Sequence, residues 1–193
     1  MKIFKFAELD AIQQESVCKE ISRLESHYYG KQFSRSAEIL SECFWKSPHT
    51  VCLALSFKKL VAACDFYSLT PDIYDAIRLG LVAEEKINAN VVVTQTPETQ
   101  SKNHWYMASI VSDPHSEQRG EAFKKIIRTA QRTIFGMSEK ESTVLGVGSS
   151  EFGKKLLRDW GFEEVNADRS AIDLRPRFEK RLDHPKDIFS LEI

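Results

Sequence analysis

Residues 104–134 constrain the fold of this chain more than any other segment. The run 104–112, "HWYMASIVS", is apolar at successive positions, as in a central strand that is covered on both faces. After a polar loop, apolar side chains recur from Phe123 to Ile134 at the spacing of one helix face. A buried strand followed by an amphipathic helix predicts a layered α/β fold in which this helix crosses over to a further strand.

The rest of the chain supplies more strands and helices for the same sheet. Patterns of alternating and β-branched residues predict strands at 2–6, 51–57, 60–69, 143–147 and 171–178, of which the second and third form a hairpin. Helical spacing predicts helices at 11–28, 36–45 and within 149–162. Residues 71–103 predict a helical insertion, in which 90–96 is either a strand or an extended loop.

Two glycines mark expected helix ends. Gly136 is expected to end the crossover helix, and Gly161 the helix within 149–162. The spacing of that last helix also predicts which side chains face inward, namely Phe152, Leu156, Leu157 and Trp160.

The composition is that of one globular domain. The 193 residues are 42% hydrophobic and 28% charged, without a Pro/Gly/Ser-rich linker, so we expect a single domain over 1–193. A net charge of −1 and short apolar runs give no indication of a nucleic-acid or membrane partner. Four cysteines without CxxC spacing and an N-terminus without a signal-peptide core favour a cytoplasmic protein. Five scattered histidines predict no metal site.

The loop "DPHSEQRGEAFKK" at 113–125 connects the predicted central strand to the predicted helix, and it places Gly120 at the start of that helix. The first turn of a helix has unpaired N–H groups and a partial positive charge, and a glycine there lets an anion approach the backbone. Residues 118–160 also carry nine Lys/Arg against five Asp/Glu. Taken alone, the loop is better explained by ordinary turn chemistry and solvated basic residues than by a bound anion.

In order and spacing, two segments resemble the GCN5-related N-acetyltransferases. Their acetyl-CoA loop reads V-x-P-x-x-(R/Q)-x-x-G-x-(G/A), and this chain has Ser112, Pro114, Glu117, Gly120 and Ala122 at those places. A later family helix reads N-x-x-A-x-x-x-Y-x-x-x-G-F, against "SEFGKKLLRDWGF" at 150–162 here. The resemblance covers about 51–70 and 104–175. It implies an α/β fold of the α+β type, with a mixed, mostly antiparallel central sheet flanked by helices.

The resemblance also implies which residues hold acetyl-CoA as cosubstrate. Backbone N–H groups of the loop would bind its pyrophosphate, and the edge of the central strand would pair with the pantetheine amides as an added strand does. Gly153 and Ser150 would line the pantetheine near the thioester. The implied cofactor-binding set is Ile110, Val111, Ser112, Gln118, Arg119, Gly120, Glu121, Ala122 and Gly153.

The chain departs from the family pattern at three points. Glu117 replaces the Arg or Gln of the loop, Leu157 replaces the helix tyrosine that often protonates the thiolate, and the strand has no carboxylate where a general base often stands. The catalytic candidates are therefore Tyr106 and His104 as bases, with Asp65 as a third, and Ser150 or Ser149 as proton donors. Direct attack without a strong protein base is the alternative.

The leading expectation is an acetyl-CoA-dependent N-acetyltransferase that acts on a primary amine by direct attack in a ternary complex. The amine is either a small molecule or part of a protein, and the sequence is also compatible with a homodimer. One alternative is a coenzyme A-binding or protein-interaction module of the same fold with weakened catalysis. Another is a related enzyme that uses a longer acyl-CoA.

Overall fold

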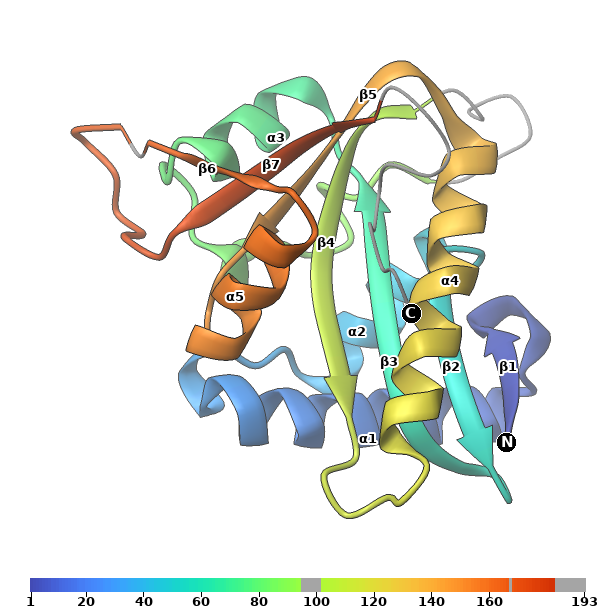
Figure 1. The fold of residues 1–193 in the computed structure, drawn as a ribbon. Helices are drawn as coiled ribbons and strands as arrows, with labels where there is room; N and C mark the ends of the chain where they lie inside the picture. Colours follow the sequence, from blue (N-terminus) through green and yellow to red (C-terminus); the bar gives the residue numbers. More distant parts are fainter. Residues whose placement is uncertain (95–101, 167, 183–193) are drawn as a thin grey trace.

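The computed structural model describes residues 1–94, 102–166 and 168–182 (Figure 1). In this part of the chain seven strands form one sheet, in the order β1-β2-β3-β4-β5-β7-β6. Their bounds are β1 (Lys2–Lys5), β2 (Val51–Ser56), β3 (Lys59–Ser68), β4 (Lys102–Ser112), β5 (Ser138–Val147), β6 (Glu163–Val165) and β7 (Arg177–Leu182). The β4–β5 pair is parallel and the other neighbouring strands are antiparallel. The predicted mixed, mostly antiparallel sheet is confirmed.

The helices lie close to their expected positions. Their bounds are α1 (Ala11–Tyr29), α2 (Ala37–Lys46), α3 (Pro71–Arg78), α4 (Arg119–Met137) and α5 (Glu151–Asp159), with 3-10 turns η1 (Phe6–Glu8), η2 (Lys31–Phe33) and η3 (Glu84–Lys86). Asp10 and Ser36 cap α1 and α2, because each side chain accepts a hydrogen bond from a backbone N–H in the first turn. None of the described helices is long and apolar enough to cross a membrane.

Helices cover both faces of the sheet, so there are two apolar cores. Figure 1 shows α4 against one face and α1 and α2 against the other. The alternation in β2 follows this division, since Val51 and Leu53 pack in the core under α1 and α2, and Cys52 and Ala54 in the core under α4. Both faces of the central strands are therefore buried, as the apolar run in β4 predicted.

The central strands β4 and β5 separate near the middle of the sheet. Their pairing ends at Met107 and Gly146, but β4 continues to Ser112 while still paired with β3. A bulge in the β3–β4 ladder marks the same place, because Phe66 pairs with Met107 and Asp65 with Ser109. Ala108 is the extra residue of this bulge. Beyond it, the edge of β4 that faces away from β3 has no partner strand among the described residues.

The insertion after β3 lies near the N-terminal half of β4, since Leu69 and Ser68 contact both the insertion and the start of β4. It contains α3 and η3, and Val92 makes an isolated antiparallel bridge to Leu69. The described part of 90–96 is thus an extended loop with one bridge, the second of the two options expected. Residues 95–101 lie outside the described residues.

Three local predictions were wrong. α4 continues through Gly136 to Met137, because a single glycine near a helix end is tolerated. Phe152 is 69% exposed in the first turn of α5 and does not face inward. Residues 171–176 form a loop, and β7 starts at Arg177, directly after the proline that cannot donate to a ladder. Gly161 does end α5, with a φ of 76°.

Candidate active site

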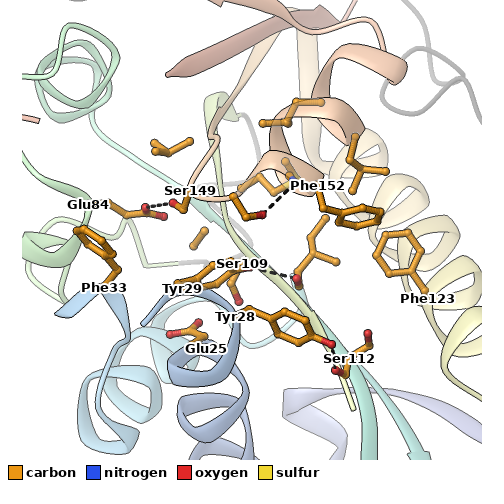
Figure 2. A pocket seen from close by; sticks show the side chains of 18 of the residues that line it. Glu25, Tyr28, Tyr29, Phe33, Glu84, Ser109, Ser112, Phe123, Ser149 and Phe152 are labelled. Carbon is orange, nitrogen blue, oxygen red and sulfur yellow. Dashed lines mark hydrogen bonds between the residues drawn. The ribbon is translucent and has the colours of Figure 1, made fainter. Parts of the chain in front are cut away.

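A cavity of about 530 Å³ opens where β4 and β5 separate. Its walls are the exposed end of β4, the C-terminal end of α1, the first turns of α4 and α5, and the η3 turn of the insertion. Figure 2 shows Glu84 and Phe33 toward one end and Phe123 and Phe152 toward the other, with Ser109 between them. The strand ends of open α/β sheets are where ligands commonly bind.

The open edge of β4 presents backbone carbonyl groups to this cavity. The backbone N–H of Asp113 donates to the carbonyl oxygen of Val61 at 2.8 Å. Backbone N–H and C=O groups alternate in direction along a strand. Those of every second residue before Asp113 therefore point to β3, and those of the residues between them point to the open edge. The carbonyl oxygens of Ile110 and Ser112 accordingly accept bonds from the cavity side. Tyr29 Oη donates to the first at 3.1 Å and Tyr28 Oη to the second at 2.9 Å.

The start of α4 forms the floor of the cavity at the end that carries Phe123. Ala122 N–H makes the first bond of the helix ladder, to Gln118 O at 2.9 Å, so the N–H groups of Gly120 and Glu121 belong to the unpaired first turn. A Cβ built on Gly120 would meet no atom within 4 Å. Arg119 and Lys124 line the cavity here and add positive charge. This end is therefore suited to an anion.

The two acidic residues of this loop point away from the cavity. Glu117 is exposed and is not part of the cavity lining. Glu121 is also exposed and forms an ion pair with Lys125 at 2.6 Å on the outer surface of α4. The like charge expected beside a bound phosphate is thus turned toward solvent, which weakens its effect.

Of the nine residues expected to bind the cofactor, five line the cavity, namely Ile110, Ser112, Arg119, Gly120 and Gly153. Val111 and Ala122 are buried, and Gln118 and Glu121 are exposed on the outside, so these four could act only through their backbone. Ser150 also lines the cavity, where its Oγ caps α5 by accepting from Gly153 N–H at 3.0 Å.

Glu84, on the 3-10 turn of the insertion, is the carboxylate best placed in the cavity. Its side chain is 17% exposed. It accepts a hydrogen bond from the Tyr106 hydroxyl, another from Arg175 Nη1 at 3.2 Å, and a long one from Ser149 Oγ at 3.5 Å. Burial raises the pKa of Glu84 to about 7, although the Tyr106 hydrogen bond and the charges of Arg175 and Arg35 act to lower it.

A second acidic group lies beneath the cavity, around Arg35. Its guanidinium binds Glu25 and Asp65, both at 1% exposure, and donates to Tyr67 Oη at 2.8 Å. Ser109 Oγ donates to Asp65 Oδ1 at 2.7 Å and so connects the cluster to β4. Two carboxylates share one arginine, which leaves this cluster with excess negative charge when all three are ionised.

The structure separates the expected catalytic residues. Tyr106 is buried beside the cavity, and burial together with the Glu84 carboxylate raises its pKa far above the ordinary value, so its hydroxyl acts as a donor at neutral pH. His104 is outside the cavity lining and packs against Tyr74, with 4.8 Å between ring centroids and an angle of 41° between the ring planes. Asp65 is held under the cavity by Arg35. Leu157 lines the cavity at the place of the family tyrosine.

Two residues of the site, Glu84 and Glu25, were not predicted from the sequence pattern. Glu84 stands next to an identical residue in "AEEKI", and nothing in the pattern distinguishes the two. Glu25 falls on a helix whose spacing is explained by core packing alone. Only the return of the insertion over β4 brings Glu84 into the cavity.

No family model and no curated protein matches the sequence. Solved structures do match. PH1933 from Pyrococcus horikoshii OT3 is 17% identical, with 95% of this chain and 99% of that chain covered and a TM-score of 0.56. Aminoglycoside 6′-acetyltransferase type Ii is 12% identical over 94% and 97%, with a TM-score of 0.52. A GNAT-family acetyltransferase from Streptococcus agalactiae is 11% identical over 95% and 96%, with a TM-score of 0.53. The chain has the fold of the GCN5-related N-acetyltransferases.

Proposed function

We propose that the chain is an acetyl-CoA-dependent N-acetyltransferase that acts on a primary amine by direct attack in a ternary complex. One observation carries this proposal: a single cavity joins the open edge of β4 to the glycine-containing start of α4. A strand edge for amides and a helix start for phosphates are the contacts that suit a thioester on a pantetheine diphosphate arm. The fold, shared with acetyltransferases, agrees with this.

The pantetheine arm would lie along the open edge of β4. The carbonyl oxygens of Ile110 and Ser112 each have two lone pairs, and each accepts one tyrosine hydroxyl. Each can therefore accept a second bond from a ligand amide without losing the first. Tyr28 and Tyr29 would then pack against the arm on one side, with Gly153 and Ser150 of α5 on the other.

The pyrophosphate would occupy the start of α4. The unpaired N–H groups of Gly120 and Glu121 would donate to it, and Arg119 and Lys124 would supply positive charge. The open space around Gly120 is what such an approach requires, since any side chain there would project toward the ligand.

The acetyl group would reach the bulge where β4 and β5 separate. Ala108 lines the cavity there and has no partner on β3, so its backbone N–H is our candidate for stabilising the oxyanion that forms during attack. The amine nitrogen forms a bond to the acetyl carbon, the C–S bond breaks, and the thiolate leaves as coenzyme A. Holding both reactants in one cavity supplies much of the rate enhancement.

The acceptor amine would enter from the end that carries Glu84, Phe33 and Glu25. The carboxylates at this end suit a positively charged amine, either a small molecule or a side chain of a protein, and the Phe33 ring is already covered by Arg175, whose Cζ lies 4.6 Å from the ring centroid. A coenzyme A-binding module without transfer is the second candidate, because Leu157 offers no hydroxyl to protonate the departing thiolate.

A transfer assay with a panel of amines tests this proposal. The full chain is incubated with acetyl-CoA and alkylamines, arylalkylamines, polyamines or lysine peptides, and the release of the coenzyme A thiol is followed. Amine-dependent release above the rate of hydrolysis supports the enzyme, and parallel runs with longer acyl-CoA define its acyl preference. Binding of acetyl-CoA without release on any amine favours the binding module. Absence of binding would contradict both.

A further inference from the structure

Glu84 occupies the acceptor end of the cavity but belongs to none of the elements that would hold the cofactor. It lies on η3, in the insertion between β3 and β4, and its carboxylate lines the cavity. Figure 2 shows it bonded to Ser149 on the side opposite Phe123 and Phe152, which flank the expected cofactor path. An insertion thus carries an acidic group to the place where the amine would meet the thioester.

The hydrogen bonds of Glu84 fix its orientation and leave room for a ligand. A carboxylate offers about four acceptor positions, and three protein donors, Tyr106, Arg175 and Ser149, approach this one. The Ser149 bond is at the 3.5 Å limit and is the weakest of the three. An N–H of an entering amine can therefore bond to Glu84 directly or take the place of Ser149.

The charges around this end favour a cation. Glu25 from α1 is on the same side of the cavity, and its partner Arg35 is shared with Asp65. Arg175, the cation that contacts Glu84, is held at 2.7 Å by Asp173. Asp173 is also paired with the buried Arg177 at 3.2 Å. Four carboxylates therefore face three arginines around this end, and an ammonium ion would meet a net charge of −1 when all of them are ionised.

We propose that Glu84 is the general base that takes a proton from the acceptor amine, with Tyr106 and Arg175 as the residues that position it. This rests on the function proposed above. The acceptor binds as an ammonium ion, one N–H bond breaks, and the proton moves to the Glu84 carboxylate and later to water. The freed lone pair attacks the acetyl carbon, the C–S bond breaks, and a second proton from the nitrogen moves to the sulfur. The products are an amide, coenzyme A and one released proton.

The environment of Glu84 suits this role better than a purely structural one. A carboxyl group whose pKa is about 7 is present in both protonation states at neutral pH, which is the condition for efficient proton transfer. A structural ion pair would gain from a fully ionised carboxylate, as in Asp173, whose pKa is lowered by its bonds to Arg175 despite partial burial.

The test compares Glu84→Gln with Glu20→Gln. Glu20 is a carboxylate on α1, half exposed and paired with Arg23 at the surface, so the control makes the same chemical change outside the cavity lining. Steady-state rates are measured across pH with an alkylamine, whose own pKa lies near 10 as for a lysine side chain, and acetyl-CoA affinity is measured by calorimetry. The wild type should lose kcat/KM below a pH of about 7.

Glu84→Gln should keep the acetyl-CoA affinity and lose roughly 100-fold or more in kcat/KM. Its kcat/KM should also no longer fall at low pH, that is, the acid limb of the pH profile should disappear. Glu20→Gln should keep the affinity, the rate and the acid limb of the wild type. Glu84→Asp, which retains a carboxyl group, serves if the glutamine variant does not fold, and should be slower with its acid limb intact. If Glu84→Gln kept both its rate and the fall of kcat/KM at low pH, Glu84 would not be the general base. The same conclusion would follow if Glu84→Asp showed no such fall. Either result would leave the proposed function itself standing. A wild type that binds acetyl-CoA but transfers to no amine would overturn the proposed function as well.

Discussion

Replacing Glu84 with glutamine should change how the stability of the chain depends on pH, even without any substrate. The carboxyl group has a pKa of about 7 when folded, against 4.5 for an ordinary glutamate. Because the folded pKa is the higher one, the folded chain holds more protons between these values, and its stability falls as pH rises through them. Glutamine keeps the shape and can still accept the Tyr106 bond, but it has no proton to lose.

The size of the effect follows from the two pKa values. Between about pH 5 and about pH 8, the wild type should lose roughly 2 to 3 kcal/mol of unfolding free energy relative to Glu84→Gln. Urea denaturation of both proteins at the two pH values measures this difference, and groups that titrate in both proteins cancel. A difference that does not change with pH, or that changes with the opposite sign, would show that Glu84 ionises normally and would remove the physical basis for its role as a base.

Three other substitutions test separate parts of the account. Tyr106→Phe removes a hydrogen bond that lowers the pKa of Glu84, so the fall of kcat/KM at low pH should begin at a higher pH. An unchanged pH profile would mean that Tyr106 does not affect the pKa of Glu84. Arg35→Met leaves Glu25 and Asp65 buried without their cation and should cost about 3 to 5 kcal/mol in urea denaturation near neutral pH. Glu117→Gln should change acetyl-CoA affinity by less than about threefold in calorimetry, because an exposed carboxylate outside the cavity is screened; a much tighter complex would place it beside the phosphates.

The sequence predicted the features that depend on neighbouring residues. The strand at β4, the glycine loop and the helix α4 follow one another without interruption, so periodicity and spacing were enough to recognise them. The end of α5 at Gly161 also depends on local backbone chemistry. These segments form the half of the candidate site that we propose for the cofactor.

The acceptor half could not be predicted, because it assembles from distant segments. Glu84 comes from the insertion, Arg175 from the loop before β7 and Tyr106 from the central strand, and only the tertiary fold brings them together. Phe152 was misplaced for a related reason. Its helical spacing fits a core position, but the first turn of α5 borders the cavity, so this side chain is exposed.

Calorimetric titration of acetyl-CoA into the wild type, Gly120→Val and Gly136→Val tests the central claim most directly. Both glycines lie on α4, and a Cβ atom added at either would meet no atom within 4 Å, so the same change should be tolerated by the fold at each site. The wild type and Gly136→Val should bind one equivalent with equal affinity. Gly120→Val should bind at least about tenfold more weakly, a loss of about 1.4 kcal/mol or more. Equal affinity of all three proteins, or no binding by the wild type, would contradict the assignment of the cavity to coenzyme A.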